Sequence, residues 1–144
     1  MWSASLFILN RGGVEPMELY HYGVPGMKWG VRRSKAQLNR ARKTSAKMVK
    51  RYKSGADYFI KTRDNIRKND YEQYKKYGYP SKEHARADDK NWNKLARVDR
   101  RIANEWSNIH KDISKMTIND VKEAKKLVAV GKAWTRKALL NAGR

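Results

Sequence analysis

Residues 95–116 read LARVDRRIANEWSNIHKDISKM, the most regular apolar pattern in the chain. Its large apolar side chains recur in steps of three and four residues, at Leu95, Val98, Ile102, Trp106, Ile109, Ile113 and Met116. This spacing places them on one face of an α-helix, with a mean step near the roughly 3.5 residues of a coiled-coil seam. Trp92 extends that face upstream. The pattern predicts a long amphipathic helix whose seam is covered by a neighbouring helix, or by a second copy of the chain if that cover is incomplete.

A second helix is predicted from residue 118 to about residue 141. Thr117 followed by Asp120 is a capping motif, which ends one helix and begins the next. Gly143 marks the end of the new helix, and its inner face comprises Val121, Ala124, Leu127, Val128, Gly131, Trp134 and Ala138. Two long amphipathic helices joined by a short turn form an antiparallel hairpin. We therefore expect the helices on either side of Thr117 to pack against each other.

Another helix is predicted over residues 34–54. Ser34 is a suitable N-cap, and the pair Ser54 and Gly55 suits a helix end. Steps of three and four again define a weakly apolar stripe, made of Leu38, Ala41, Ser45, Met48 and Tyr52. Lysines and arginines cover the remaining faces. This helix is expected to lean on the hairpin through its stripe.

A fourth helix is predicted over residues 56–77, with a short inner face of Phe59, Thr62 and Ile66. The sequence Gly78-Tyr79-Pro80 would end it, because proline lacks an amide donor and disfavours helix at the preceding residue. No strand pattern is evident, except for a turn or short hairpin within 20–31. The sequence thus predicts an all-α fold: a small helical bundle built on a long antiparallel helical hairpin, with an irregular Gly/aromatic N-terminal segment.

The chain is strongly basic, with 34 lysines and arginines against 14 acidic residues among 144, a net charge of +20. The first 53 residues carry half of that net charge, and no acid occurs from Arg32 to Lys53. Such self-repulsion is relieved by an anionic partner, most often nucleic acid, then an acidic protein surface or an anionic membrane. We expect the helix over 34–54 to bind DNA or another polyanion, independently of sequence, through Arg32, Arg33, Lys35, Arg40, Arg42, Lys43, Lys47, Lys50, Arg51 and Lys53.

Other partner classes have weaker support. No helix-turn-helix or zinc-finger signature is present, so base-specific reading is not expected. No apolar run approaches the roughly 20 residues that span a bilayer. Peripheral membrane binding by the basic helix is disfavoured, because its apolar face is thin and lacks Trp and Phe, comprising only Leu38, Met48, Val49 and Tyr52.

Catalytic and metal-binding patterns are not evident in the sequence. The chain has no cysteine, and its three histidines, His21, His84 and His110, are isolated from one another. The glycines match neither GxGxxG nor GxxxxGK[ST], and no preceding strand is predicted. No Ser/His/Asp or Cys/His set is recognisable. We therefore expect a protein that is not an enzyme and that uses no cofactor and no metal.

The segment YHYGVPGMKWGVRR, at residues 20–33, differs from the helical remainder. Its glycines permit tight turns, and Val24 to Met27 suit a type II turn. Aromatic and cationic side chains interleaved in this way suit a protein-binding hot spot, which we favour, or a platform for single-stranded nucleic acid. A local cap on the first helix is the structural alternative. The expected docking residues are Tyr20, His21, Tyr22, Gly23, Gly26, Lys28, Trp29, Gly30, Arg32 and Arg33.

The stretch also resembles a short motif, roughly H-[HY]-G-[IV]-x-G-[MQ]-K-W-G-x-R-R, that recurs in phage and prophage proteins of Gram-positive bacteria. Those proteins are virion-associated or uncharacterised. Matching positions are His21, Tyr22, Gly23, Val24, Gly26, Met27, Lys28, Trp29, Gly30, Arg32 and Arg33. Many such proteins continue with YQNxDGxLTxxGxxRY, whereas this chain continues with SKAQLNRARKTSAK. The resemblance implies a phage or prophage origin, and a short docking peptide rather than a fold.

The division of the chain follows from these patterns. Arg11-Gly12-Gly13 can be encoded by codons that resemble a bacterial ribosome-binding site, a few codons before Met17. Residues 1–16 are thus interpreted as a leader or mis-annotated start without order. They are followed by a docking motif at 17–33, a basic helix at 34–54 and a helical hairpin or bundle at 55–144.

Together these features predict a small, basic, non-enzymatic protein encoded by a phage or prophage. It would be virion- or head-associated, docking on a phage structural protein through residues 20–33 and binding nucleic acid through its basic helix. The alternative is a cytoplasmic phage effector that binds and inhibits a host protein. The expected location is therefore the virion or the cytoplasm of the bacterial host.

Overall fold

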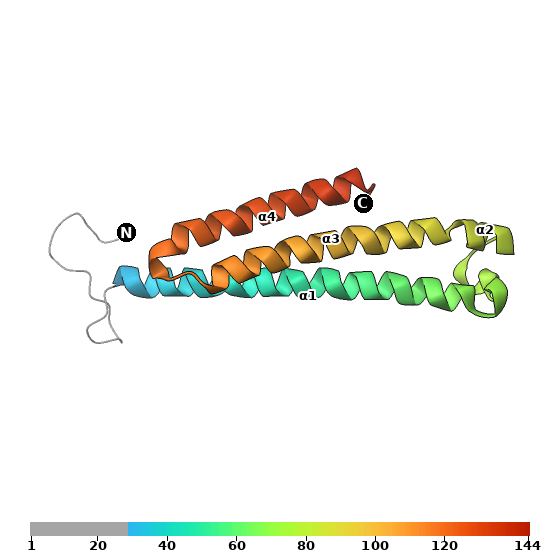
Figure 1. Ribbon diagram of the computed structural model, residues 1–144, viewed down its shortest axis with the longest axis horizontal. Helices are drawn as coiled ribbons and strands as arrows, with labels where there is room; N and C mark the ends of the chain where they lie inside the picture. The colour runs from blue at the N-terminus through green and yellow to red at the C-terminus, as the bar shows by residue number, and fades with distance from the viewer. Residues whose placement is uncertain (1–28) are drawn as a thin grey trace.

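A computed structural model describes residues 29–144, which form an elongated bundle of helices without a strand in that range (Figure 1). Three long helices dominate it: α1 (Trp29–Tyr71), α3 (Asp89–Ser114) and α4 (Val121–Asn141). Short elements join them, namely η1 (Tyr74–Tyr77), α2 (Lys82–Ala87) and η2 (Ile118–Asp120). The predicted all-α helical bundle is confirmed.

Helices α1 and α3 form the long antiparallel hairpin of the molecule (Figure 1). The backbone of α1 leaves helical geometry at Lys68, and η1 and α2 then carry the chain across to α3. Gly78 adopts a left-handed conformation with φ of 84°, which glycine tolerates without steric cost. The prediction that Gly78-Tyr79-Pro80 ends a helix over 56–77 is wrong in its bounds, because α1 ends at Tyr71 and Gly78 ends only the short element η1. Ser81 caps α2 by accepting a hydrogen bond from the amide of His84.

Helix α4 returns along the bundle and lies beside the N-terminal half of α1 and the C-terminal half of α3 (Figure 1). It runs in the same direction as α1. The turn before it contains the predicted capping box, in which Thr117 and Asp120 satisfy each other's backbone amides. Helix α4 therefore covers only one end of the α1–α3 hairpin. The other end consists of two helices with η1 and α2 at the tip.

The main core lies where the three helices meet, and Trp106 is its largest buried side chain. The Trp106 indole Nε1 donates a hydrogen bond of 2.8 Å to Oγ1 of buried Thr135, which joins α3 to α4. Its buried neighbours come from all three helices, namely Leu38, Ala41, Tyr52, Ile102, Ala103, Ile109, Ile113 and Ala124. The predicted seam is thus covered by helices of the same chain, since Val98 and Met116 pack against this cluster as well.

A second, smaller core occupies the two-helix end. It is built on Ile66, Tyr71 and Ala85, with aromatic side chains packed around them. The Tyr71 hydroxyl donates to Asp89 at 2.7 Å, and the Tyr79 hydroxyl donates to Asp88. Burial is the main cause that raises the pKa of both tyrosines above the usual value of 10.

The prediction of separate helices over 34–54 and 56–77 is wrong, because α1 is continuous through Ser54 and Gly55. Gly55 is on the face toward α3, where the side chain of buried Asp99 occupies the space that a Cβ would need. Gly55 therefore permits close helix packing rather than ending a helix. Ser34 is not an N-cap either, since α1 begins at Trp29. Residues 29–33, expected to be irregular, are helical.

The expected pairing of helices also needs correction. The sequence predicted that the helices on either side of Thr117 form the long hairpin, with the basic helix leaning on them. Instead α1 is the main partner of α3 along its length, and α4 is the shorter addition (Figure 1). The stripe predicted on the basic helix is nevertheless on the packed face, because Leu38, Ala41, Ser45 and Tyr52 are all buried.

Candidate nucleic-acid interface

The N-terminal half of α1 presents an almost uniformly cationic outer surface. No acid occurs on this helix before Asp57. Its buried stripe faces the core, so the cations are left on the remaining faces. Eight of the ten cations predicted to bind nucleic acid are exposed: Arg33, Lys35, Arg40, Lys43, Lys47, Lys50, Arg51 and Lys53.

Two of the ten predicted cations are half-buried, Arg32 and Arg42. The Arg42 guanidinium donates a hydrogen bond of 2.7 Å to the backbone carbonyl of Met116, in the turn that follows α3. Its Nε is buried without a hydrogen-bond partner. Arg42 therefore ties α1 to the turn that leads into α4, which leaves its charge less available to a ligand than that of its neighbours.

Ion pairing separates the two ends of the bundle. The ion pairs between described residues all involve carboxylates of the two-helix end or of the middle of α3, in Asp64, Asp70, Glu72, Asp89 and Asp99. Within residues 29–144, the exposed cations of α1 from Arg33 to Lys53 make no ion pair. The acidic residues thus neutralise cations at one end and leave the other end with unbalanced positive charge.

Helix α4 adds a second row of cations to the same end, which sequence reasoning missed. Between Val121 and Asn141 it has a single acid, Glu123. Its six cations are all exposed: Lys122, Lys125, Lys126, Lys132, Arg136 and Lys137. The scarcity of acids in this helix was visible in the sequence. The sequence did not reveal that α4 lies beside the basic half of α1.

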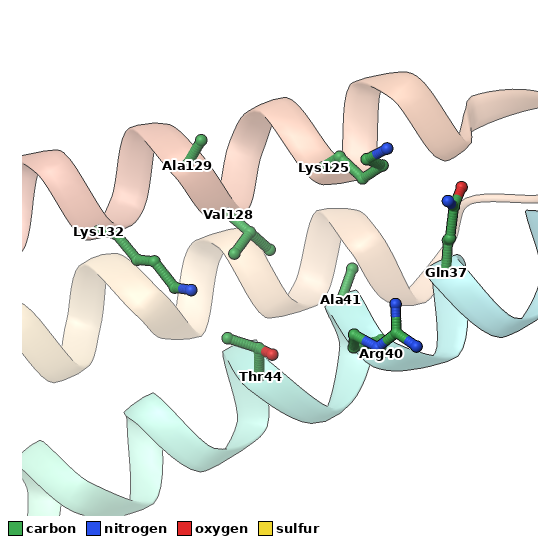
Figure 2. A pocket seen from close by; sticks show the side chains of 8 residues that line it. All are labelled: Gln37, Arg40, Ala41, Thr44, Lys125, Val128, Ala129 and Lys132. Carbon is green, nitrogen blue, oxygen red and sulfur yellow. The ribbon is translucent and has the colours of Figure 1, made fainter.

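A groove between α1 and α4 brings the two cationic rows together. Its volume is about 350 Å³, and its walls come from Gln37, Arg40, Ala41 and Thr44 on α1 and from Lys125, Val128, Ala129 and Lys132 on α4. Figure 2 shows the side chains of both helices around this gap, with Val128 and Ala41 between the longer polar chains. The lining includes three cations and no carboxylate.

The predicted docking segment lies mostly outside the described residues. This applies to Tyr20, His21, Tyr22, Gly23, Gly26 and Lys28. The remaining docking residues, from Trp29 to Arg33, form the first turn of α1. The motif therefore leads directly into the basic helix, and Arg33 is exposed at the start of the cationic surface.

Comparison with known proteins gives one match. Residues 16–36 match the Family of unknown function (DUF7211). This segment spans the predicted docking motif and the first two turns of α1, a small part of the 144 residues. No curated protein and no solved structure matches the chain.

Residues 29–144 were predicted to contain neither a metal site nor a catalytic set of side chains. No group of three or more metal-ligating side chains occurs among them. Ser45 Oγ lies 2.8 Å from His110 Nδ1, a pair that sequence reasoning missed because 65 positions separate them. Ser45 is fully buried between α1 and α3, and its hydroxyl also donates to the carbonyl of Arg42. This pair is a polar contact between α1 and α3.

None of the helices within residues 29–144 has an apolar stretch long and hydrophobic enough to span a bilayer. This agrees with the sequence-based expectation of no membrane span. The apolar face of the basic helix is moreover turned into the protein, since Leu38 and Tyr52 are buried.

Proposed function

We propose that this protein binds nucleic acid without sequence specificity through the cationic end of its bundle. The observation that carries the proposal is the row of exposed α1 cations from Arg33 to Lys53, with no acid on that half of the helix and no ion pair to neutralise them. Folding retains this charge despite its repulsion, and phosphates would relieve that repulsion.

The arrangement suits contacts to phosphates rather than to bases. Lysines and arginines spread around the outer arc of a straight helix provide positive charge along its length, and no separate reading element protrudes from the described bundle (Figure 1). Each phosphate neutralised on duplex DNA contributes about −0.9 to the slope of log affinity against log salt. Binding by this surface would therefore be steeply salt-dependent and indifferent to sequence.

The biological context belongs to the same proposal. The protein would be a non-enzymatic product of a phage or prophage, located in the virion or in the host cytoplasm, and associated with the phage head. The resemblance of residues 20–33 to a phage motif supports this context. The continuity of the motif with α1 supports it further, because a structural protein bound at 20–28 would hold the basic helix beside the packaged DNA.

The test is fluorescence anisotropy of the full chain with a mixed-sequence DNA duplex across a salt series. One variant changes the eight exposed cations of α1, from Arg33 to Lys53, to glutamine. Its charge-matched control changes eight exposed cations of the other half, Lys61, Lys68, Lys75, Lys76, Lys90, Lys94, Arg97 and Arg100. We expect a steep slope for the native chain that the first variant loses and the control largely keeps.

Two outcomes would contradict the proposal. Equal losses in the two variants would mean that net charge alone, rather than this surface, attracts DNA. Weak binding of the native chain at physiological salt, unchanged by the α1 substitutions, would point to a protein partner. That partner would then be a phage structural protein or, as the alternative function requires, a host protein. A pull-down with the native chain, with the Trp29→Ala variant as control, would capture it.

A further inference from the structure

We infer that one phosphodiester backbone lies in the groove between α1 and α4, where Arg40, Lys125 and Lys132 hold it from both sides. This inference rests on the proposed function and specifies its site. It also assigns α4 to the binding surface, which the charge pattern of the basic helix does not suggest. The ligand class is a single strand of nucleic acid or one strand of a duplex.

The electrostatics of the groove favour an anion. Three cations from two different helices line a space of about 350 Å³, and no carboxylate lines it. Packing α4 against α1 thus brings like charges together, which opposes the contact between the two helices. A phosphate placed between them would turn this repulsion into attraction from both walls.

The shape and the remaining lining suit a chain of phosphates and sugars. Ala41 and Val128 provide small apolar side chains between the longer polar chains, so that a ligand backbone can approach closely (Figure 2). The Thr44 hydroxyl and the Gln37 amide, on the same side of the groove as Arg40, can donate hydrogen bonds to phosphate oxygens. The groove therefore combines charge, donors and a shallow apolar surface.

The cations continue beyond the groove in matching steps. On α1, Arg40 is followed by Lys47 and Arg51, and on α4, Lys125 is followed by Lys132 and Arg136, each time in steps of seven and four. These steps keep side chains on one face of a helix, and the two helices run in the same direction (Figure 1). Eleven residues of helix span about 16 Å, which corresponds to about five phosphates of one DNA strand.

The length of the two rows is the reason to favour nucleic acid over an acidic protein segment. Two parallel rows of cations suit a ligand that carries a charge at every repeat of its backbone, as a nucleic-acid strand does. Acidic side chains of a protein seldom form so continuous a line. A membrane surface is flat and would not enter a groove between two helices.

The test compares two variants that lose the same charge. The groove variant carries Arg40→Gln, Lys125→Gln and Lys132→Gln, and the control carries Lys35→Gln, Lys43→Gln and Lys50→Gln on exposed α1 positions outside the groove. We expect the groove variant to bind a DNA duplex at least ten-fold more weakly, with a salt slope smaller by about 2 to 3. The control should lose markedly less, and circular dichroism should show that both variants remain helical.

A second measurement uses the native chain and does not depend on the variants. Lysine acetylation with and without the DNA should reveal stronger protection of Lys125 and Lys132 than of Lys43 and Lys50. Equal losses in both variants, or equal protection of all four lysines, would overturn the groove site while the proposed function stands. No binding by the native chain would overturn the function itself, and displacement of DNA by polyglutamate of equal charge would assign the groove to acidic peptides instead.

Discussion

Gly131 lies on α4 where the side chains of α3 leave no room for a Cβ. A Cβ at this position would lie 2.8 Å from the Trp106 ring and 2.7 Å from Cδ1 of Ile109. The isoleucine methyl can turn aside, whereas the buried indole is held by its hydrogen bond to Thr135. We therefore expect Gly131→Ala to lower the free energy of unfolding by about 1–2 kcal/mol, since overpacking outweighs the gain in helix propensity. Thermal unfolding followed by circular dichroism measures it.

Gly30→Ala is the matched control for that substitution. A Cβ on Gly30 would meet nothing within 4 Å, and this glycine lies in the first turn of α1. Alanine should leave stability unchanged or raise it by up to about 1 kcal/mol, because it restricts the unfolded chain. If both substitutions shifted the midpoint equally, Trp106 would not be packed against Gly131 as described.

Tyr71 and Tyr79 give the protein a predictable response to alkaline pH. Their hydroxyls donate to Asp89 and Asp88, and burial raises the pKa of each above the usual 10. Between the unfolded and folded pKa values the unfolded chain binds fewer protons than the folded chain. Stability from these groups is therefore full below about pH 10 and is lost as the pH rises through their folded pKa values.

We expect Tyr71 and Tyr79 to ionise above the usual pKa of about 10 in an ultraviolet titration of the folded protein. In the double variant Tyr71→Phe, Tyr79→Phe these late transitions should vanish, and stability should depend less steeply on pH above 10. Tyr58→Phe is the control, because Tyr58 is 62% exposed. Late transitions that persisted in the double variant would contradict the assignment.

Individual residues were predicted well where a periodic pattern contained them. Ile102, Trp106 and Ile113 were assigned to the seam from spacing alone, and all three are fully buried. Arg42 shows the limit of such reasoning. The charge pattern predicted that Arg42 binds nucleic acid like its neighbours. Its guanidinium instead contacts the carbonyl of Met116, which is 74 positions away in the sequence.

The continuity of α1 is the main property of the individual elements that the sequence did not reveal. We expect Ser54→Pro to lower the free energy of unfolding by about 3 kcal/mol or more. Proline in a helix interior removes a backbone hydrogen bond and clashes with the preceding turn. Two separate helices joined at this point would tolerate it. Circular dichroism and thermal unfolding of the variant distinguish these cases.

Ser54→Ala is the control, since Ser54 is exposed and alanine is a strong helix former. It should unfold at the native temperature or slightly above. A proline variant as stable as this control would mean that α1 bends at Ser54 at no cost, as the sequence-based division into two helices implied.

The periodic patterns identified which face of each helix is buried, but not which helix covers it. The stripe from Leu38 to Tyr52 and the seam from Val98 to Met116 were both found, whereas the pairing of α1 with α3 was not. A short turn at Thr117 favoured the neighbouring helix as partner. Gly55 misled in a similar way, because its close approach to Asp99 becomes visible only in three dimensions.

The candidate site belongs to the whole molecule, and only its α1 half could be predicted. Ten cations without an acid are readable from residues 32–53, and most of them are exposed. The α4 half depends on the register that sets Lys125 and Lys132 opposite Arg40. The segregation of charge depends on folding too, because the acids engaged in ion pairs are at the two-helix end or mid-α3.

This segregation of charge should make the stability of the bundle depend on salt concentration. With a net charge of +20 and unpaired cations concentrated at one end, repulsion should exceed the attraction of the few exposed ion pairs. Raising the salt concentration should therefore raise the unfolding temperature, by about 3–5 °C for each kcal/mol of repulsion that is screened.

A DNA duplex should have the same effect at much lower ionic strength, because it binds the folded bundle. The groove variant with Arg40→Gln, Lys125→Gln and Lys132→Gln should respond less to both, whereas an unfolding temperature that fell with added salt would show that ion pairs dominate.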